Sequence, residues 1–418
     1  MKVDDSHSNY MYNFIDTICK KFGPRYSCSK AEMDATLWIK EELDKFCDST
    51  FIDEFETRPA MYPQGFIKVA GFLGGISPIF IPLLFPLPII SLILVIMGLI
   101  IIYAELFLMK EWIKFLFKKK RSSNVFGIIK PKGEVKFRII FEGHTDSAKE
   151  MFIASYKPRT RQVIAAIGMY FLIHTILFSI CKFTAQILPG NPIIILNWTI
   201  FSWTIIDTIY FISLIIIYPF FILLIRGFLG KKVVLGANDN LSGSAVSSAI
   251  GKILSEDRPQ HVEIWIGSQG SEEVGDKGAK AFVEKYGKLG ILDNSYTVVL
   301  ECCGAADRML LIEKDMHTKN YPKEIIEKLQ MSYENAKIGT PDILKLDIGS
   351  LKIGSCDACR YVHKGYKAIP LFGAESKKNK AVNWHSVKDS PENISKHVLK
   401  DFLTICLKFV EFIDKSFI

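Results

Sequence analysis

The chain has 418 residues, of which 49% are hydrophobic, and a formal net charge of +8 at pH 7. The hydrophobic residues concentrate in residues 72–109 and 163–225, so the composition excludes a uniformly soluble protein and favours an α/β domain joined to membrane segments. The basic residues crowd beside the apolar segments, which argues against a nucleic-acid partner. The nine cysteines show no repeated spacing, which favours reduced thiols over a disulfide framework.

Periodic apolar positions predict the elements of the soluble part. Residues 8–48 are predicted to be helical with a turn at Gly23-Pro24, and residues 50–57 alternate like a strand. Two strands joined by a turn at Lys132-Gly133 are predicted over 124–133 and 135–143, and further strands over 261–268 and 296–301. Helical patterns occupy about 243–255, 276–286, 323–337 and 391–414. This alternation predicts an α/β domain with a mixed sheet flanked by helices.

The two apolar regions predict about four transmembrane helices. One crossing needs about 20 residues, so residues 72–109 accommodate two crossings, with the Pro-rich FPLP at 85–88 as the break. Residues 163–180 predict a third crossing. Residues 193–225 exceed one span, which predicts a fourth helix that is tilted or begins along the membrane interface. The predicted soluble domain is discontinuous and comprises residues 1–69, 118–160 and 229–418. The two predicted transmembrane hairpins comprise residues 70–117 and 161–228.

Charge predicts the orientation of this multi-pass protein in the lipid bilayer. Basic clusters at 110–121, 157–161 and 226–232 lie where the apolar inserts meet the soluble domain, and such clusters favour the cytoplasmic side. A cytoplasmic soluble domain is therefore predicted. His174 and Asp207 fall within predicted spans, where an ion pathway is one interpretation, and a hydrogen bond between helices or a location at the membrane interface is favoured over it.

Acids and histidines follow several predicted strands at the point where each strand gives way to a loop. They are His144 in FEGHTDS, Asp239 in GANDNLSG, Glu272 and Glu273 in GSEEVG, Glu301 in VVLECCG and His385 in NWHS. Zinc binds imidazole nitrogens and carboxylate oxygens, and buried acids without a cation are costly. Each motif alone is also typical of a turn, a cap or a solvated pair. Together they predict a two-metal hydrolase.

The order of these motifs resembles the M28 family of zinc metallopeptidases. The segments FGPRYSCSKAEMDATLWIKEEL, GSEEVGDKGAKAF and GSCDACRYVHKGYKAIP contribute to the resemblance, which covers roughly the whole soluble part and neither apolar insert. The resemblance implies two Zn²⁺ ions that share Asp239. The implied ligand sets are His144, Asp239 and Glu301 for one ion, and Asp239, Glu273 and His385 for the other.

The same resemblance assigns the remaining roles. Glu272 would be the general base, Asp146 would orient His144, and Asp357 would be an acid near the substrate pocket. Two departures from the family pattern stand out: Glu301 occupies a position that is more often Asp, and the segment between His144 and Asp239 is unusually long. A long insertion costs little closure entropy, roughly 0.6 kcal/mol per doubling of length, so it is compatible with a working site.

The leading prediction is a membrane-integrated zinc exopeptidase, an aminopeptidase that hydrolyses peptide N-termini. The alternatives are a glutaminyl-cyclase-like acyltransferase that uses one zinc, and a scaffold that kept the M28-like fold without chemistry. The complete ligand set favours the peptidase. Cys356 and Cys359 form a CxxC that is typical of a redox pair or half a zinc knuckle, but the chain has no second CxxC to complete a four-thiolate site.

Overall fold

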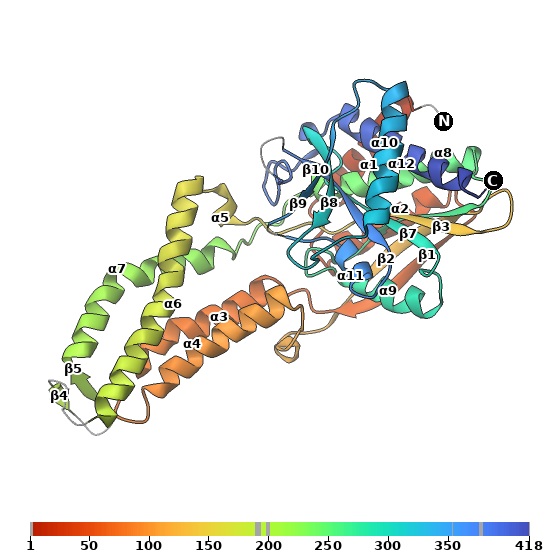
Figure 1. Ribbon diagram of the computed structural model, residues 1–418. Helices are drawn as coiled ribbons and strands as arrows, with labels where there is room; N and C mark the ends of the chain where they lie inside the picture. Colours follow the sequence, from red (N-terminus) through yellow and green to blue (C-terminus); the bar gives the residue numbers. More distant parts are fainter. Residues whose placement is uncertain (1–2, 189–193, 198–200, 353, 376–378, 418) are drawn as a thin grey trace. The chain divides into compact units, whose positions relative to one another are not determined.

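A computed structural model describes residues 3–188, 194–197, 201–352, 354–375 and 379–417 (Figure 1). The chain forms two compact units, each assembled from separate stretches of sequence. The first, called the sheet unit below, comprises Met1–Pro59, Lys119–Glu150 and Lys232–Ile418. The second, called the helical unit, comprises Ala60–Lys118 and Met151–Lys231.

The sheet unit is built on an eight-stranded mixed sheet with the order β1-β2-β6-β3-β7-β10-β8-β9. Four central strands run parallel, because β3 pairs in parallel with β6 and β7, and β10 pairs in parallel with β7. The strands are β1 (Ser49–Thr57), β2 (Lys120–Ile129), β3 (Phe137–His144), β6 (Val262–Gln269), β7 (Ser295–Glu301), β8 (Arg308–Lys314), β9 (Leu346–Ser350) and β10 (Ala368–Ala374). The predicted mixed α/β architecture is confirmed.

Helices cover both faces of this sheet. Successive strand residues point to opposite faces, and in β6 Ile266 lies against α8 while Trp265 lies against α9. Gly251 makes the α8 approach possible, since a Cβ there would lie 2.2 Å from Ile266 Cδ1. The helices of this unit are α1 (Asp5–Phe22), α2 (Lys30–Leu43), α8 (Ser242–Glu256), α9 (Lys277–Lys288), α10 (Lys323–Gly339), α11 (Ala358–Val362) and α12 (Lys396–Lys415).

One predicted connection differs in the structure. The strands expected on either side of Lys132-Gly133 exist as β2 and β3, but they do not pair with each other, since β6 lies between them. The backbone N–H groups of Lys132 and Gly133 donate to the carbonyl oxygens of Pro259 and Gln260, at 2.9 and 2.8 Å. The segment is therefore held against the loop that precedes β6 instead of closing a hairpin.

The helical unit contains four main helices, of which three are long and apolar enough to cross a membrane. They are α3 (Gln64–Ile76), α4 (Ile89–Ile102), α6 (Pro158–Ile187) and α7 (Ile205–Gly227). The three candidate spans within the described residues are Ile89–Phe107, Arg159–Ile187 and Ile205–Gly227. Helix α3 lies beside α4 (Figure 1), but its 13 residues give a length of only about 20 Å, short of the roughly 30 Å hydrocarbon core. The predicted count of four spans is therefore not confirmed.

The prediction of a fourth helix over 193–225 was wrong for the first part of that range. The described residues there form a short hairpin of β4 (Ile194–Asn197) and β5 (Ser202–Thr204), and the helix begins only at Ile205. Asp207 fixes this start, because its carboxylate accepts hydrogen bonds from the backbone N and the hydroxyl of Thr204, at 2.6 and 2.7 Å. Such a cap satisfies donors that the first turn leaves open.

Polar contacts link α6 to α7 inside the helical unit. Lys182 of α6 is fully buried and forms an ion pair with Asp207, while it also donates to the carbonyl oxygen of Ser202. His174 Nε2 and Ser213 Oγ lie 2.8 Å apart, which confirms the predicted hydrogen bond between helices for that histidine. Both contacts, together with one between Thr175 and Tyr210 at 3.0 Å, bridge the two helices beside a cluster of buried apolar side chains.

Candidate metal centre

The parallel strands bring the predicted site residues to one edge of the sheet. His144 is the last residue of β3 and Glu301 the last residue of β7, while Glu272 and Glu273 lie in the loop after β6, which ends at Gln269. Asp239 lies in the turn Ala237–Leu241 before α8, and His385 lies in the loop between β10 and α12. The carboxyl ends of parallel strands share an edge, which explains the convergence of residues so distant in sequence.

Asp239 stands at the centre of this group. Its Oδ1 is 3.3 Å from Nε2 of His144, and its Oδ2 is 3.4 Å from Nε2 of His385. The Nε2 of His385 also lies 3.1 Å from Oε2 of Glu273, and the Nε2 of His144 lies 3.6 Å from Oε2 of Glu272. One carboxylate thus faces two imidazoles with its two oxygens.

The turn that carries Asp239 is fastened on both sides. Asp389 accepts the backbone N–H groups of Asn238 and Asp239, at 2.6 and 3.1 Å. Asn240 donates to the carbonyl oxygen of Leu300 at 2.8 Å and accepts the N–H of Cys302 at 3.1 Å, which ties the turn to the end of β7. The position of the central carboxylate is therefore set by backbone contacts on two flanks.

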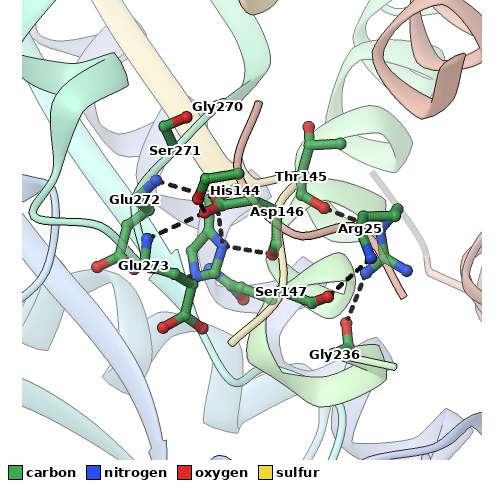
Figure 2. A network of polar contacts seen from close by, with 12 residues as sticks. Arg25, His144, Thr145, Asp146, Ser147, Gly236, Gly270, Ser271, Glu272 and Glu273 are labelled. Atoms are coloured by element: carbon green, nitrogen blue, oxygen red, sulfur yellow. Dashed lines mark hydrogen bonds and ion pairs between the residues drawn. The ribbon is translucent and has the colours of Figure 1, made fainter. Parts of the chain in front are cut away.

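Asp146 contributes more than orientation of the neighbouring imidazole. Its Oδ1 lies 3.4 Å from Nδ1 of His144, and that nitrogen is closer to the main-chain oxygen of Asp146, at 3.1 Å. The Asp146 carboxylate also accepts the backbone N–H groups of Glu272 and Glu273, at 2.9 and 3.1 Å (Figure 2). Ser27 donates its hydroxyl to the same carboxylate. Asp146 thereby positions the loop that carries both glutamates.

Arg25 is a buried cation that sequence reasoning did not single out. Its guanidinium donates to the carbonyl oxygens of Thr145 at 2.8 Å and of Gly236 at 3.3 Å (Figure 2). It also donates to the carbonyl oxygen of Gly23 at 2.8 Å. It therefore ties the segment after α1 to the loops that carry His144 and Asp239. Its only sequence signal is its place directly after the Gly23-Pro24 turn.

Glu32 is a second supporting residue that the sequence did not reveal. Its Oε1 accepts the N–H of Ser271 at 2.9 Å and the hydroxyl of Ser122 at 3.0 Å. Burial, followed by the nearby charge of Asp146, raises the pKa of Glu32 to about 8. The carboxyl anchors the loop that precedes Glu272 from the side of α2.

Burial and charge shift the titration of the central acids in opposite directions. Burial raises the pKa of Glu301 to about 8, and it raises the pKa of Glu272 well above its usual value, with Asp276 and Glu273 adding to the effect against the charge of His144. The pKa of Asp239 is lowered, because contacts with His144 and His385 outweigh the effect of burial. Asp239 is the acid held most firmly in its charged form.

The donor set fits divalent cations. Among the described residues, Asp239 Oδ2, Glu273 Oε1 and Glu301 Oε1 are buried without a hydrogen-bond partner. Three overlapping groups each place their ligand atoms within 4.8 Å of one another, and these groups are His144, Asp239 and Glu273; His144, Glu272 and Glu301; and Asp239, Glu301 and Cys302. Buried acids with open lone pairs are stabilised by a cation, and nitrogen and oxygen ligands suit zinc.

Asp357 lies at the start of α11 and is fully buried. Neither of its carboxylate oxygens has a hydrogen-bond partner among the described residues. Burial raises its pKa well above the usual range, and the charges of Asp276 and Glu142 add to the shift. A contact between Asp357 and substrate stays a prediction.

Comparisons with known proteins agree with this geometry. Residues 218–410, just under half of the chain, match the model of peptidase family M28. Residues 218–410 are therefore similar to the M28 family. This region includes Asp239, Glu272, Glu273, Glu301 and His385 and confirms the predicted resemblance. A comparison with curated proteins found no match for this sequence.

Solved structures share the fold of this chain. The zinc aminopeptidase BSAP from Bacillus subtilis has a TM-score of 0.54 and 13% identity, covering 96% of this chain and 94% of that chain. A glutaminyl cyclase from an Acidobacteriales bacterium has a TM-score of 0.56 and 13% identity, covering 100% and 97%. A leucine aminopeptidase precursor from Bacteroides thetaiotaomicron VPI-5482 has a TM-score of 0.53 and 12% identity, covering 98% of both chains. These likenesses confirm a zinc-exopeptidase-like fold.

Proposed function

We propose that the sheet unit is a two-zinc aminopeptidase. The observation that carries the proposal is the position of Asp239, whose two oxygens each face one imidazole, those of His144 and His385. A carboxylate so placed would hold two cations, one with each oxygen. The remaining ligands would be Glu301 on the His144 side and Glu273 on the His385 side. The M28 match and the fold support zinc as the metal.

Zinc ions held at this site would lower the pKa of water and polarise the scissile carbonyl. Glu272 is placed to take the proton from that water and return it to the leaving amine. Asp146 holds the backbone of Glu272 through a 2.9 Å hydrogen bond, so the base keeps its direction during the transfer.

The proposed substrate is the free N-terminus of a peptide. Zinc aminopeptidases are among the structures that share the fold, and they support this choice over cleavage within a chain. The glutaminyl cyclases support an alternative with one zinc. The bridging position of Asp239 favours the two-metal reading over that alternative.

Metal content and turnover test the proposal together. The purified full-length protein should hold two zinc ions at this centre and release amino acids from the N-termini of a peptide mixture. Glu272→Gln should keep its metal but lose about 10²–10⁴-fold in kcat, the usual contribution of a general base. The control is Glu284→Gln, an exposed position on α9. Equal turnover of Glu272→Gln and wild type would reject Glu272 as the general base. One bound metal together with cyclisation of N-terminal glutamine would indicate the cyclase, and protein that binds no metal would indicate the scaffold.

We further propose that the helical unit lies in a lipid bilayer with the sheet unit on the cytoplasmic side. Strands β1 and β2 pair with each other on either side of the first insert, so that insert must begin and end on the same side. The second crossing beside α4 would therefore have to be made by α3 together with the 3₁₀ turn Ser77–Phe80 that follows it. The second insert obeys the same rule, since β3 and β6 pair across it. Large apolar side chains such as Ile215 and Ile216 are 75% and 69% exposed, as lipid-facing residues would be.

The orientation follows from the basic residues at the ends of the inserts. Single cysteines placed at the exposed positions Lys231 and Lys45 should both be protected from an impermeant thiol reagent in sealed cells and should both react after lysis. Labelling of either one in intact cells would contradict a cytoplasmic sheet unit.

A further inference from the structure

A second cluster of metal-ligand side chains lies in the sheet unit, separate from the six residues above. It consists of Asp276, His317 and Cys359, whose ligand atoms all lie within 4.8 Å of one another. Asp276 precedes α9, His317 follows β8 and Cys359 belongs to α11. The Sγ of Cys359 is 3.5 Å from Oδ2 of Asp276. Three segments distant in sequence thus place sulfur, nitrogen and oxygen donors together.

Burial makes the cluster unlike a surface group of polar residues. Cys359 is fully buried, Asp276 is 3% exposed, and His317 is partly exposed. The buried Asp276 carboxylate is paired with Arg360 on Oδ2, and the thiol beside the same oxygen is only a weak hydrogen-bond donor. The partly exposed imidazole supplies a route by which an ion reaches the buried donors.

Neighbouring groups hold these side chains in position. The hydroxyl of Ser355 lies 2.8 Å from Nδ1 of His317, a contact that orients the imidazole. The Nε of Arg360 lies 3.3 Å from Oδ2 of Asp276, and the same guanidinium donates to the carbonyl oxygen of Gly275 at 2.7 Å. Asp276 itself has a φ of 50°, a conformation that few non-glycine residues adopt. Such contacts around ligands are typical of built metal sites.

We propose that Asp276, His317 and Cys359 bind a third divalent ion, separate from the two of the proposed active site. A mixed set of thiolate, imidazole and carboxylate suits zinc or a similar transition metal and disfavours Mg²⁺ and Ca²⁺, which prefer oxygen. Three protein ligands leave one tetrahedral position for water. The site assigns a role to the second cysteine of the CxxC, and both Cys356 and Cys359 are free thiols in the structure.

The position of this ion gives it a structural consequence for the active site. Asp276 lies three residues after Glu273, and Cys359 lies two residues after Asp357. An ion bound to both segments fixes the start of α9 against α11, the two helices that follow those acids. The bound ion therefore stabilises the walls of the site without touching the reacting atoms.

Cobalt substitution tests the third site independently of activity. The ligands proposed for the active site are nitrogen and oxygen atoms, so a cobalt–thiolate charge-transfer band in the near ultraviolet reports on Cys359, provided that Cys302→Ser, which removes the thiol beside Asp239 and Glu301, keeps the band. Full-length protein loaded with Co²⁺ should show this band, and Cys359→Ser should lose it together with one equivalent of metal. Cys406→Ser, a buried thiol on α12 outside the cluster, should keep both.

A milder variant keeps the test meaningful if Cys359→Ser fails to fold. Ser355→Ala removes only the contact to His317 and should weaken binding of one Co²⁺ by about 10–100-fold, the usual effect of losing such a partner. The peptidase metals should stay bound in this variant.

The outcomes separate the two proposals. A thiolate band with no aminopeptidase activity supports the third site and rejects the proposed function. Activity with two metals and no thiolate band rejects the third site and keeps the function. A band that survives Cys359→Ser also rejects the third site, because another thiol would then be the ligand.

Discussion

Replacing Arg25 by methionine tests how far a single buried cation organises the candidate site. Methionine has a similar length but no donors, so the carbonyl oxygens of Gly23, Thr145 and Gly236 lose the guanidinium. The backbone contacts between Arg25 and Ser147, at 2.9 and 3.0 Å, are kept in the variant. The substitution therefore isolates the side chain.

The magnitude follows from the three acceptors. Each buried carbonyl left without a donor costs about 1–3 kcal/mol, so the gross loss is about 3–9 kcal/mol. Relief from burying a guanidinium offsets several kcal/mol of this loss. A net destabilisation of about 3 kcal/mol corresponds to a fall in Tm of roughly 6 °C for a domain of this size.

Thermal unfolding of the purified protein measures the effect. Arg258→Met is the matched control, since Arg258 pairs with Asp48 at the surface with its side chain 30% exposed, and such pairs contribute about 1 kcal/mol or less. Arg25→Lys should fall between wild type and Arg25→Met, because it keeps the charge with fewer directed donors. Equal shifts for Arg25→Met and Arg258→Met would refute the reasoning.

Three further predictions concern packing, pH and the helical unit. Gly243→Ala should destabilise the protein by about 1–3 kcal/mol or more and reduce its metal content, because the new Cβ would lie 2.1 Å from the carbonyl oxygen of Leu300. The control is Gly339→Ala, where the new Cβ would have no atom within 4 Å and should leave the thermal unfolding unchanged. The pKa of Glu32 is about 8 in the folded protein and near 4.5 in the unfolded chain, so between these values the folded protein holds a proton that the unfolded chain releases. The free energy of unfolding should therefore fall as the pH rises across this window, by up to about 1.4 kcal/mol per pH unit. Glu32→Gln should flatten that slope, and an unchanged slope would contradict it. In detergent-solubilised protein, Lys182→Met should lower the free energy of unfolding by about 3–5 kcal/mol, because it leaves Asp207 buried without its partner. Lys231→Met, at an exposed position, should have a negligible effect, and adding Asp207→Asn to Lys182→Met should recover part of the lost stability.

The convergence of the candidate site could be predicted because it depends on strand ends. His144 and Glu301 close apolar strand patterns, and parallel strands bring such ends to one edge. The supporting residues could not be predicted, because their partners are backbone groups. Arg25 binds three carbonyl oxygens from three loops, and no side-chain pattern marks those acceptors.

Two elements show where sequence patterns were insufficient. Strand β10 contains Pro370, and proline normally indicates a sheet edge, yet β10 lies between β7 and β8. In the first apolar insert, hydropathy predicted two full spans, but α3 ends at Ile76. The run Gly74-Gly75 followed by Ser77-Pro78 carried the signal for that end, since glycine and proline interrupt helices.

The interleaved path of the chain has a consequence for its synthesis. Strand β3 pairs only with β6 and β7, which the ribosome produces after the second insert, Met151–Lys231. At about 5–20 residues per second, that insert of roughly 80 residues takes about 4–16 s to translate. During this interval the nascent β1–β2 pair stands with an unpaired apolar strand, and a two-stranded pair alone is marginally stable in water. Insertion of the helices must therefore keep pace with translation, or the exposed strand edge becomes a site for aggregation.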